Sequence, residues 1–224
     1  MFKGKKCYAI ILAGGESRRF GGNVSKTLQM LNEKPIIVHS LVAFQKNEFI
    51  DEIYAVVNSV EGYDFEGWIA NFGLTKFKNH TKGGQTRQES SKKGLEAVQN
   101  AQDDSIILIH DGARPFVSQE IINNIIADAF EYGAAAPGLK VTDTIKKAKD
   151  GFFVETLERE HLYSIQTPQG FHYSIINKSH TQNLWQNLTD DAALVEKLGI
   201  KIKIVESNSN NIKITYKSDL ELIK

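Results

Sequence analysis

The sequence predicts an α/β fold in which a mainly parallel sheet is flanked by helices. Short apolar runs alternate along the chain with longer amphipathic stretches, which is the pattern of strand–helix–strand units. The 224 residues suit one such domain, and 41% of them are hydrophobic, an ordinary share for a globular protein. We therefore expect residues 1–224 to form a single domain.

The first half of the chain contributes three predicted strands and two predicted helices. Residues 7–12 are a continuous apolar run and predict a buried strand. Residues 35–44 carry apolar side chains at helical spacing behind a proline that suits the first helical turn. Residues 52–57 predict a second strand, 74–77 a third and weaker one, and 86–99 a helix.

The next two elements are predicted from the same kinds of signal. Residues 105–109 (Ser-Ile-Ile-Leu-Ile) predict a buried strand. Residues 118–132 predict a helix, because Ser118 is a good N-cap residue and apolar side chains follow it at helical spacing. Gly133 stands where a helix C-cap is expected, so we expect this helix to end there.

Residues 138–170 depart from this alternation, and within them we predict a protruding hairpin arm over 138–160. Within them, 141–147 and 152–156 alternate in polarity, and Lys149-Asp150-Gly151 lies between the two runs, which is typical of a β-hairpin with an Asp-Gly turn. A two-stranded hairpin is barely stable alone in water. The arm therefore needs a surface to pack on, either its own domain or a second subunit, and the residues leave both open.

Composition argues against several classes of function. The 27 Lys and Arg residues balance 27 Asp and Glu residues, which argues against a broad nucleic-acid or polybasic membrane surface. The single cysteine, Cys7, excludes an internal disulfide and a cysteine-based metal cluster. No run approaches 18 apolar residues, and the start lacks a signal-peptide pattern. We therefore expect a cytoplasmic protein that binds neither nucleic acid nor membranes.

The first candidate site is a glycine-rich segment directly after the first predicted strand. In residues 12–22 (Leu-Ala-Gly-Gly-Glu-Ser-Arg-Arg-Phe-Gly-Gly) small residues let a ligand approach backbone N–H groups that can bind an anion. Arg18, Arg19 and Lys26 add positive charge. The segment matches neither the P-loop nor the dinucleotide-binding pattern. We therefore expect an anion site of another kind.

Two further candidate sites lie after other predicted strands, where parallel sheets bind their ligands. Residues 110–115 (His-Asp-Gly-Ala-Arg-Pro) offer a carboxylate that can hold Mg²⁺ and an arginine for an anionic group, whereas we assign His110 no chemistry. Residues 82–90 combine two glycines with the start of a helix, whose N–H groups favour an anion. The candidate groups are cations, glycines and one carboxylate, and no serine or cysteine nucleophile is among them. This set of groups fits phosphoryl or nucleotidyl transfer.

Eight motifs then occur in order from about residue 6 to residue 222. They are Leu-Ala-Gly-Gly-x-x-Arg-Arg-Phe with Lys26, Gly-Gly-x-x-Arg-x-x-Ser at 83–90, His-Asp-Gly-Ala-Arg-Pro at 110–115, Asp-Thr-Ile-Lys at 143–146, Arg159, Gln-Thr-Pro-Gln-Gly-Phe at 166–171, Thr-Asp-Asp-Ala at 189–192 and Asn-Ile-Lys-Ile-Thr at 211–215. Together they resemble the 2-C-methyl-D-erythritol 4-phosphate cytidylyltransferases. The resemblance implies a Rossmann-like nucleotidyltransferase fold with a hairpin arm. It also implies transfer of CMP from CTP to the polyol phosphate, with release of pyrophosphate, in non-mevalonate isoprenoid biosynthesis.

The resemblance implies that CTP, as co-substrate, is bound by backbone and by cations. The CTP loop is Ala13, Gly14 and Gly15, and the triphosphate and the transition state are held by Arg19 and Lys26. The residues implied on the cytidine side are Gly84, Gln85 and Ser90. Asp111 is implied as the ligand of Mg²⁺.

For the polyol phosphate the resemblance implies residues from five parts of the chain. Gly112 and Arg114 flank the sugar-phosphate site, and Thr167, Thr189 and Lys213 complete the pocket. Thr144 and Arg159 lie on the arm of residues 138–160, which in this family reaches into the partner's active site. A homodimer joined through the arm is therefore implied as well.

Two departures from the family and two alternative functions stay open. Many members have proline where this chain has Ser25, and serine does not fix φ, so we expect a more mobile loop. The Gly14-Gly15 pair is shared with other sugar nucleotidyltransferases. The alternatives are a ribitol 5-phosphate cytidylyltransferase and a non-catalytic nucleotide-binding protein on the same scaffold. Retention of Arg19, Lys26 and Asp111 argues against the second.

Overall fold

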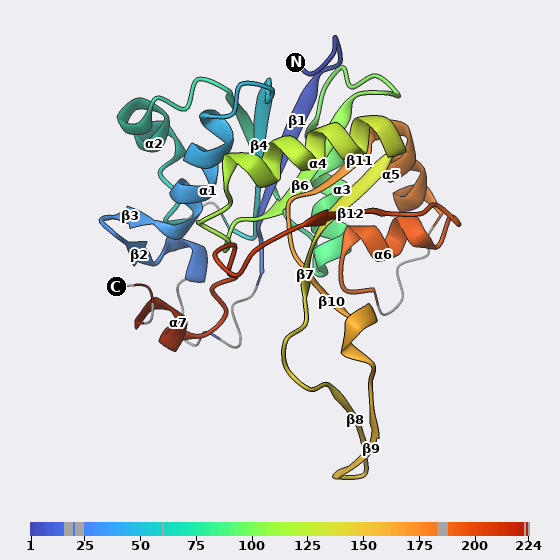
Figure 1. Cartoon of the computed structure of the whole chain (residues 1–224). Helices are drawn as coiled ribbons and strands as arrows, with labels where there is room; N and C mark the ends of the chain where they lie inside the picture. Colours follow the sequence, from blue (N-terminus) through green and yellow to red (C-terminus); the bar gives the residue numbers. More distant parts are fainter. Residues whose placement is uncertain (16–19, 21–24, 60, 183–187, 222, 224) are drawn as a thin grey trace.

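The computed structural model describes residues 1–15, 20, 25–59, 61–182, 188–221 and 223, and Figure 1 shows their arrangement. Within these residues eight strands form one mixed sheet with helices on both of its faces. The first four strands are parallel neighbours in the order β5 (Phe77–Lys82), β4 (Glu52–Val57), β1 (Cys7–Ala13) and β6 (Ile106–Asp111). The predicted fold class is confirmed.

The remaining strands extend the sheet beyond β6. β11 (Gln169–His172) is antiparallel to β6 and to β7 (Ala134–Lys140), and β10 (Tyr163–Ile165) is antiparallel to β7. β12 (Lys203–Glu206) runs parallel to β7. A separate small hairpin consists of β2 (Met30–Leu31) and β3 (Lys34–Pro35), and two short 3₁₀ turns are η1 (Lys26–Leu28) and η2 (Arg159–His161).

Strand β1 lies in the middle of both cores. All seven of its residues are buried, and successive side chains point to opposite faces of the sheet. Ala9 and Ile11 pack in the core that contains α1 (Ile36–Gln45), α2 (Phe65–Phe72) and α4 (Gln119–Tyr132). Ile10 packs in the other core, with α3 (Arg87–Ala97), α5 (Tyr173–Thr181) and α6 (Asp191–Glu196). A strand covered on both sides needs an unbroken apolar run, which is why its sequence signal is strong.

Most of the predicted elements are confirmed, with small shifts of their ends. Ser118 caps α4 by accepting a hydrogen bond from the Ile121 N–H, and Gly133 ends it with a φ of 83°. Pro35 stands at the N-cap of α1, one residue before the first turn. Thr86 caps α3 in a capping box with Glu89.

The predicted strand over 74–77 is wrong, and the real strand begins at Phe77. Leu74 is buried in the turn that follows α2, which explains its apolar character without a strand. β5 lies at the edge of the sheet, its side chains after Phe77 are polar, and all of its residues are at least partly exposed. An edge strand is not covered on both sides, so it lacks the apolar run that signals a central strand.

Several elements carry no signal that predicted them. β7 has the sequence Ala-Ala-Ala-Pro-Gly-Leu-Lys, and both proline and glycine disfavour strands. It is a strand because β11 and β12 pair with it on either side. The other elements without a prediction are α2, α5, α6, β2, β3, β10, β11, β12, the turns η1 and η2, and α7 (Lys217–Glu221).

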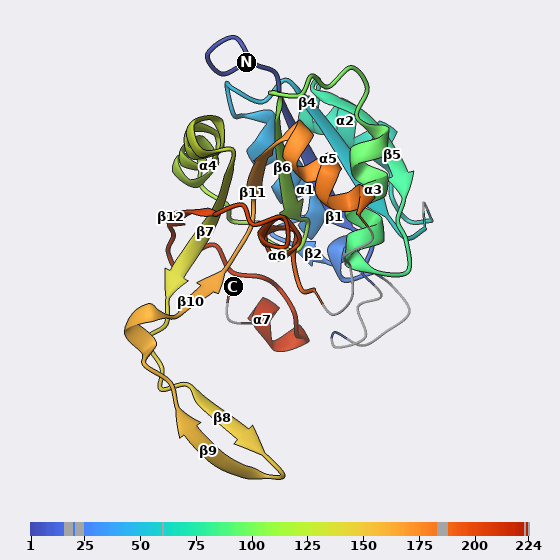
Figure 2. The ribbon, with the colours of Figure 1, turned by 90° about the vertical axis from the view of Figure 1, so that its right-hand side faces the viewer.

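The arm is a β-hairpin, as predicted, and it projects from the body in both views (Figures 1 and 2). β8 (Lys146–Lys149) pairs antiparallel with β9 (Phe152–Thr156). Asp150 and Gly151 have φ values of 49° and 85°, as a type I′ turn requires. Every residue of both strands is exposed, so the arm is not packed on its own domain.

No helix among the described residues has the length and apolar character to cross a membrane.

We predict that Gly94→Ala destabilises the protein although alanine is the better helix former. Gly94 lies on the face of α3 that meets the sheet, where a Cβ atom would stand 2.5 Å from Ile10 Cγ2 and 3.0 Å from Val56 Cγ2. We expect the free energy of unfolding to fall by about 1–2 kcal/mol, because overpacking outweighs the gain in helix propensity.

Urea denaturation measures this change, and Glu96→Ala on the exposed face of the same helix is the control. A Gly94→Ala variant as stable as the control would show that α3 does not approach the sheet so closely.

Candidate active site

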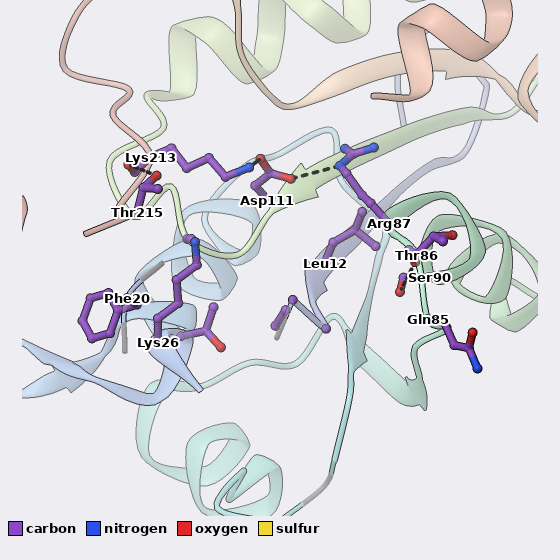
Figure 3. Close-up of a pocket in the computed structure, with 15 residues that line it drawn as sticks. Leu12, Phe20, Lys26, Gln85, Thr86, Arg87, Ser90, Asp111, Lys213 and Thr215 are labelled. Carbon is purple, nitrogen blue, oxygen red and sulfur yellow. Dashed lines mark hydrogen bonds and ion pairs between the residues drawn. The ribbon is translucent and has the colours of Figure 1, made fainter. Parts of the chain in front are cut away.

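Two adjoining cavities open at the carboxyl ends of the parallel strands. The first has a volume of about 830 Å³ and is walled by the end of β1, the start of η1, the start of α3 and the 211–215 segment (Figure 3). The second has a volume of about 700 Å³ and lies toward β10, β12 and α6. Arg87, Asp111 and Lys213 line both cavities, so these three side chains form the boundary between them.

Asp111, the last residue of β6, is surrounded by cations. Lys213 Nζ donates a hydrogen bond of 2.7 Å to Asp111 Oδ2. Arg87 Nε lies 3.5 Å from Oδ1, and Arg114 Nε lies 3.9 Å from Oδ2. Burial alone would raise the pKa of Asp111, but Arg87 and Lys213 hold it well below its usual range. The carboxylate is therefore ionised at neutral pH.

Thr167 supports this carboxylate through the backbone. Its Oγ1 accepts a hydrogen bond of 3.0 Å from the Asp111 N–H and lies 3.2 Å from His110 Nδ1. Burial lowers the pKa of His110 to about 4, so its ring is neutral at pH 7. The ring also lies 3.1 Å from the Arg114 carbonyl oxygen. These contacts fit a supporting role for His110 and assign it no chemistry, as the sequence suggested.

Arg87 is the central site residue that the sequence did not single out. Its Nη1 donates a hydrogen bond of 2.6 Å to Oδ2 of Asp191, which is fully buried. His180 Nε2 lies 3.4 Å from the other oxygen of the same carboxylate. Although burial opposes it, the charge of Arg87, with a smaller contribution from His180, lowers the pKa of Asp191 to about 2. Arg87 is thus held between two buried carboxylates.

The Thr-Asp-Asp-Ala motif has one capping residue and one charge partner. Asp190 caps α6, because its Oδ1 accepts a hydrogen bond of 3.0 Å from the Ala193 N–H. Asp191 pairs with Arg87, which lies 104 residues earlier in the chain. Gln169 Oε1 accepts hydrogen bonds from the N–H groups of Asp191 and Ala192. Both motifs were visible in the sequence, but only the fold joins them.

The backbone of the glycine-rich loop lies where the sequence placed it. Ala13, the last residue of β1, lines the first cavity together with Gly14 and Gly15, which follow it. A Cβ atom on Gly14 would stand 2.8 Å from Asn58 Oδ1, so a larger residue there would require the Asn58 side chain to move. Gln85 and Ser90 line the same cavity, and Ser90 Oγ lies 3.5 Å from where a Cβ atom on Gly14 would stand.

Gly84 and Gly112 shape the wall without lining either cavity. The Gly84 N–H donates a hydrogen bond of 3.1 Å to Ser90 Oγ, and the Gly112 N–H donates one of 2.8 Å to the Leu12 carbonyl oxygen. Direct ligand contact by these two residues stays a prediction.

Lys26 enters the first cavity from its lower side (Figure 3). Its Nζ donates a hydrogen bond of 2.9 Å to the carbonyl oxygen of Ile214, between Lys213 and Thr215. The 211–215 segment is attached to the sheet, since the Ile214 N–H donates to the Ala113 carbonyl oxygen at 2.9 Å. Arg19, the other predicted triphosphate ligand, lies outside the described residues.

The structure brings most of the predicted residues together but leaves two apart. Arg114, Thr167 and Thr189 line the second cavity, and Lys213 lines both. Thr144 and Arg159 are exposed on the arm and at its base, and neither lines either of these two cavities. Arg159 Nη1 instead donates a hydrogen bond of 2.6 Å to the Thr142 carbonyl oxygen.

We predict that Arg87→Ala lowers the free energy of unfolding by about 3 kcal/mol, because it leaves the buried Asp191 without its cation. Chemical denaturation at pH 7 measures the loss. The control is Lys147→Ala, which breaks the ion pair between Lys147 and Glu155 on the exposed arm and should cost less than about 0.5 kcal/mol. Equal losses in the two variants would contradict a supporting role for the Arg87–Asp191 pair.

Comparison with known proteins identifies the family. Residues 7–224 match the model of the family described as 2-C-methyl-D-erythritol 4-phosphate cytidylyltransferase. The protein of that name from Clostridium novyi is 44% identical over 97% of this chain and 94% of its own length, and the one from Geobacillus kaustophilus is 40% identical over 95% and 92%.

Solved structures show the same fold. The 4-diphosphocytidyl-2C-methyl-D-erythritol synthase of Anaerococcus prevotii has a TM-score of 0.84 and 26% identity over 98% of this chain and 94% of that one. The 2-C-methyl-D-erythritol 4-phosphate cytidylyltransferase of Thermus thermophilus has a TM-score of 0.77 and 27% identity over 96% and 95%. This chain therefore belongs to the 2-C-methyl-D-erythritol 4-phosphate cytidylyltransferase family of CTP-dependent nucleotidyltransferases.

Proposed function

We propose that this protein transfers CMP from CTP to 2-C-methyl-D-erythritol 4-phosphate, giving 4-CDP-2-C-methyl-D-erythritol and pyrophosphate. The observation that carries the proposal is the cationic boundary between two cavities, where Arg87 and Lys213 flank Asp111. Two phosphorylated substrates need such a boundary, because their reacting groups are both anionic. The names of the relatives supply the identity of the acceptor.

The first cavity fits CTP and the second fits the polyol phosphate. The loop of Ala13, Gly14 and Gly15 would bind the triphosphate through N–H groups, while Gln85 and Ser90 face the cytidine side. In the second cavity Arg114 is the candidate partner of the acceptor phosphate, and Thr167 and Thr189 are the candidate polar contacts of the polyol.

The reaction needs no nucleophile from the protein. An oxygen of the acceptor phosphate forms a bond to the α-phosphorus of CTP, the bond from that phosphorus to its bridging oxygen breaks, and pyrophosphate leaves with the electron pair. The approach of two anions costs Coulomb energy, which the charges of Lys26 and Lys213 offset. Arg19 is proposed to assist Lys26 at the triphosphate, as the resemblance implies.

Asp111 is the residue that would hold Mg²⁺. Its carboxylate is ionised, it lies at the boundary of both cavities, and Mg²⁺ commonly takes one or two protein carboxylates and completes its shell with phosphate oxygens. Among the described residues no group of three or more His, Cys, Asp or Glu side chains could hold a metal ion, so the substrate must supply further ligands. When bound, the ion would neutralise charge on the phosphates.

We predict that the protein releases pyrophosphate from CTP with 2-C-methyl-D-erythritol 4-phosphate and Mg²⁺, and that Lys26→Ala lowers kcat by a factor on the order of 10²–10³. The loss follows from removing a cation that stabilises charge in the transition state. A coupled pyrophosphate assay measures both rates, and EDTA should stop the release.

The same assay with ribitol 5-phosphate separates the acceptors. Faster release with ribitol 5-phosphate would favour the ribitol enzyme, and CTP binding without release for either acceptor would favour a non-catalytic nucleotide-binding protein. An unchanged kcat in Lys26→Ala would remove that residue from the mechanism.

The arm is proposed to join two subunits and to complete the partner's site. Phe152, Phe153 and Val154 at its end are 76%, 77% and 60% exposed, an apolar surface that water disfavours. Thr144 and Arg159 line neither of the two cavities of their own chain. A homodimer of residues 1–224 with the 138–160 arm exchanged accounts for both observations.

We predict that Lys26→Ala and Arg159→Ala subunits restore activity when unfolded and refolded together. If Arg159 serves the partner's site, a mixed dimer holds one site with both residues intact, so random pairing leaves about a quarter of all sites intact. Pyrophosphate release measures the recovery, and sedimentation equilibrium measures the oligomeric state. Separately refolded variants are the control. No recovery in a mixture of dimers would place Arg159 in the site of its own chain.

A further inference from the structure

The side chain of Tyr63 joins both flanks of Lys26 to the sheet. Its Oη lies 2.7 Å from Thr27 Oγ1 and donates to Ser25 Oγ at 3.0 Å. The two smaller hydroxyls lie 2.9 Å from each other, so the three oxygens form a closed triangle. The Tyr63 Oη also lies 3.4 Å from the carbonyl oxygen of Ala13, at the carboxyl end of β1. One hydroxyl group thus contacts the residues before and after Lys26 and the strand from which the loop starts.

The ring of Tyr63 is anchored independently of its hydroxyl. It stacks on Phe65 at a centroid distance of 5.7 Å and meets Trp68 edge-on at 6.0 Å. Phe65 and Trp68 are buried in the hydrophobic core that contains α1, α2 and α4. An aromatic side chain held by such contacts loses little entropy when its hydroxyl forms hydrogen bonds. The hydroxyl is therefore a fixed point next to Thr27, which lines the first cavity.

The backbone at Ser25 shows what this fixed point restrains. Ser25 has a φ of −53° and a ψ of 133°, after which η1 begins at Lys26, and its carbonyl oxygen accepts a hydrogen bond of 3.0 Å from the Leu28 N–H. Serine has no ring to hold φ near this value, whereas proline would hold it near about −65°. In this chain the hydroxyl triangle replaces the missing covalent restraint and sets the direction from which Lys26 enters the cavity.

We propose that Tyr63 is a positioning residue of the nucleotidyl transfer, which fixes the backbone on both sides of Lys26 so that its ammonium group meets the triphosphate. The proposal rests on the proposed function through the role of Lys26. Tyr63 does not line either cavity, so it acts through Lys26 and not by touching the substrates.

The test is a double-mutant cycle of Tyr63→Phe and Lys26→Ala in the pyrophosphate assay. Tyr63→Phe keeps the ring and removes the hydroxyl, and we expect it to lower kcat roughly 5–10-fold while the KM for the polyol phosphate stays unchanged. In the Lys26→Ala background the same substitution should have no further effect, because the group that it positions is gone. Equal losses of kcat in both backgrounds, or no loss in either, would overturn the proposal.

Two further variants separate positioning from general damage. Ser25→Pro in the Tyr63→Phe protein restores the backbone restraint by other means, so we expect it to recover most of the lost kcat; no recovery would overturn the proposal. Tyr54→Phe is the matched control, because it removes a buried tyrosine hydroxyl that donates to Glu52 and lines neither cavity. It should leave kcat and both KM values unchanged.

The proposed function is tested separately, by the rate of pyrophosphate release in the wild type and in Lys26→Ala alone. If the wild type released no pyrophosphate, the proposed function would fail. Calorimetric titration with CTP would then still test Tyr63, since unchanged CTP affinity in Tyr63→Phe would overturn its role and a weaker affinity would support it.

Discussion

Three cations lie around one carboxylate at the end of β6, and this arrangement determines much of the site. Arg87, Arg114 and Lys213 would repel one another at such distances in a partly buried space. Asp111 offsets that repulsion from the centre, and Asp191 offsets it from behind Arg87. The positive charges are thus in place before an anionic substrate arrives, and little reorganisation is needed when charge develops in the reaction. The chain's net charge of zero is compatible with this, because the opposing charge is local.

The cluster exists because the fold brings the ends of distant segments to one edge of the sheet. Asp111 ends β6, Arg87 begins α3, Asp191 begins α6, and Lys213 lies in a segment tied to Ala113. Carboxyl ends of parallel strands meet at the same edge, so the loops after β1 and β6 are neighbours although about one hundred residues separate them. The hydroxyl of Tyr63 lies at the same edge of the sheet, because it contacts the Ala13 carbonyl oxygen at the end of β1.

The arm differs from these segments, because it projects away from the body of the protein. Its strands and its apolar tip are exposed in the single chain, and a two-stranded hairpin alone is barely stable in water. An exchanged arm would make assembly and catalysis interdependent, because Arg159 of one chain would then work in the cavity of the other. Binding of the polyol phosphate would in that case depend on the concentration of protomers.

The sequence by itself determined the features that depend on a few adjacent residues. The buried run of β1, the Ser118 and Gly133 caps of α4 and the Asp150-Gly151 turn follow from local hydrogen bonding, φ preference and burial. Several residues that the family resemblance named line the cavities, among them Lys26, Asp111 and Lys213. Only the tertiary structure decided the strand character of β7, the start of β5, the pairing of Arg87 with Asp191 and the contacts of Tyr63. These depend on which segments pack side by side, and no preference of a residue for its own backbone conformation encodes a partner many residues away.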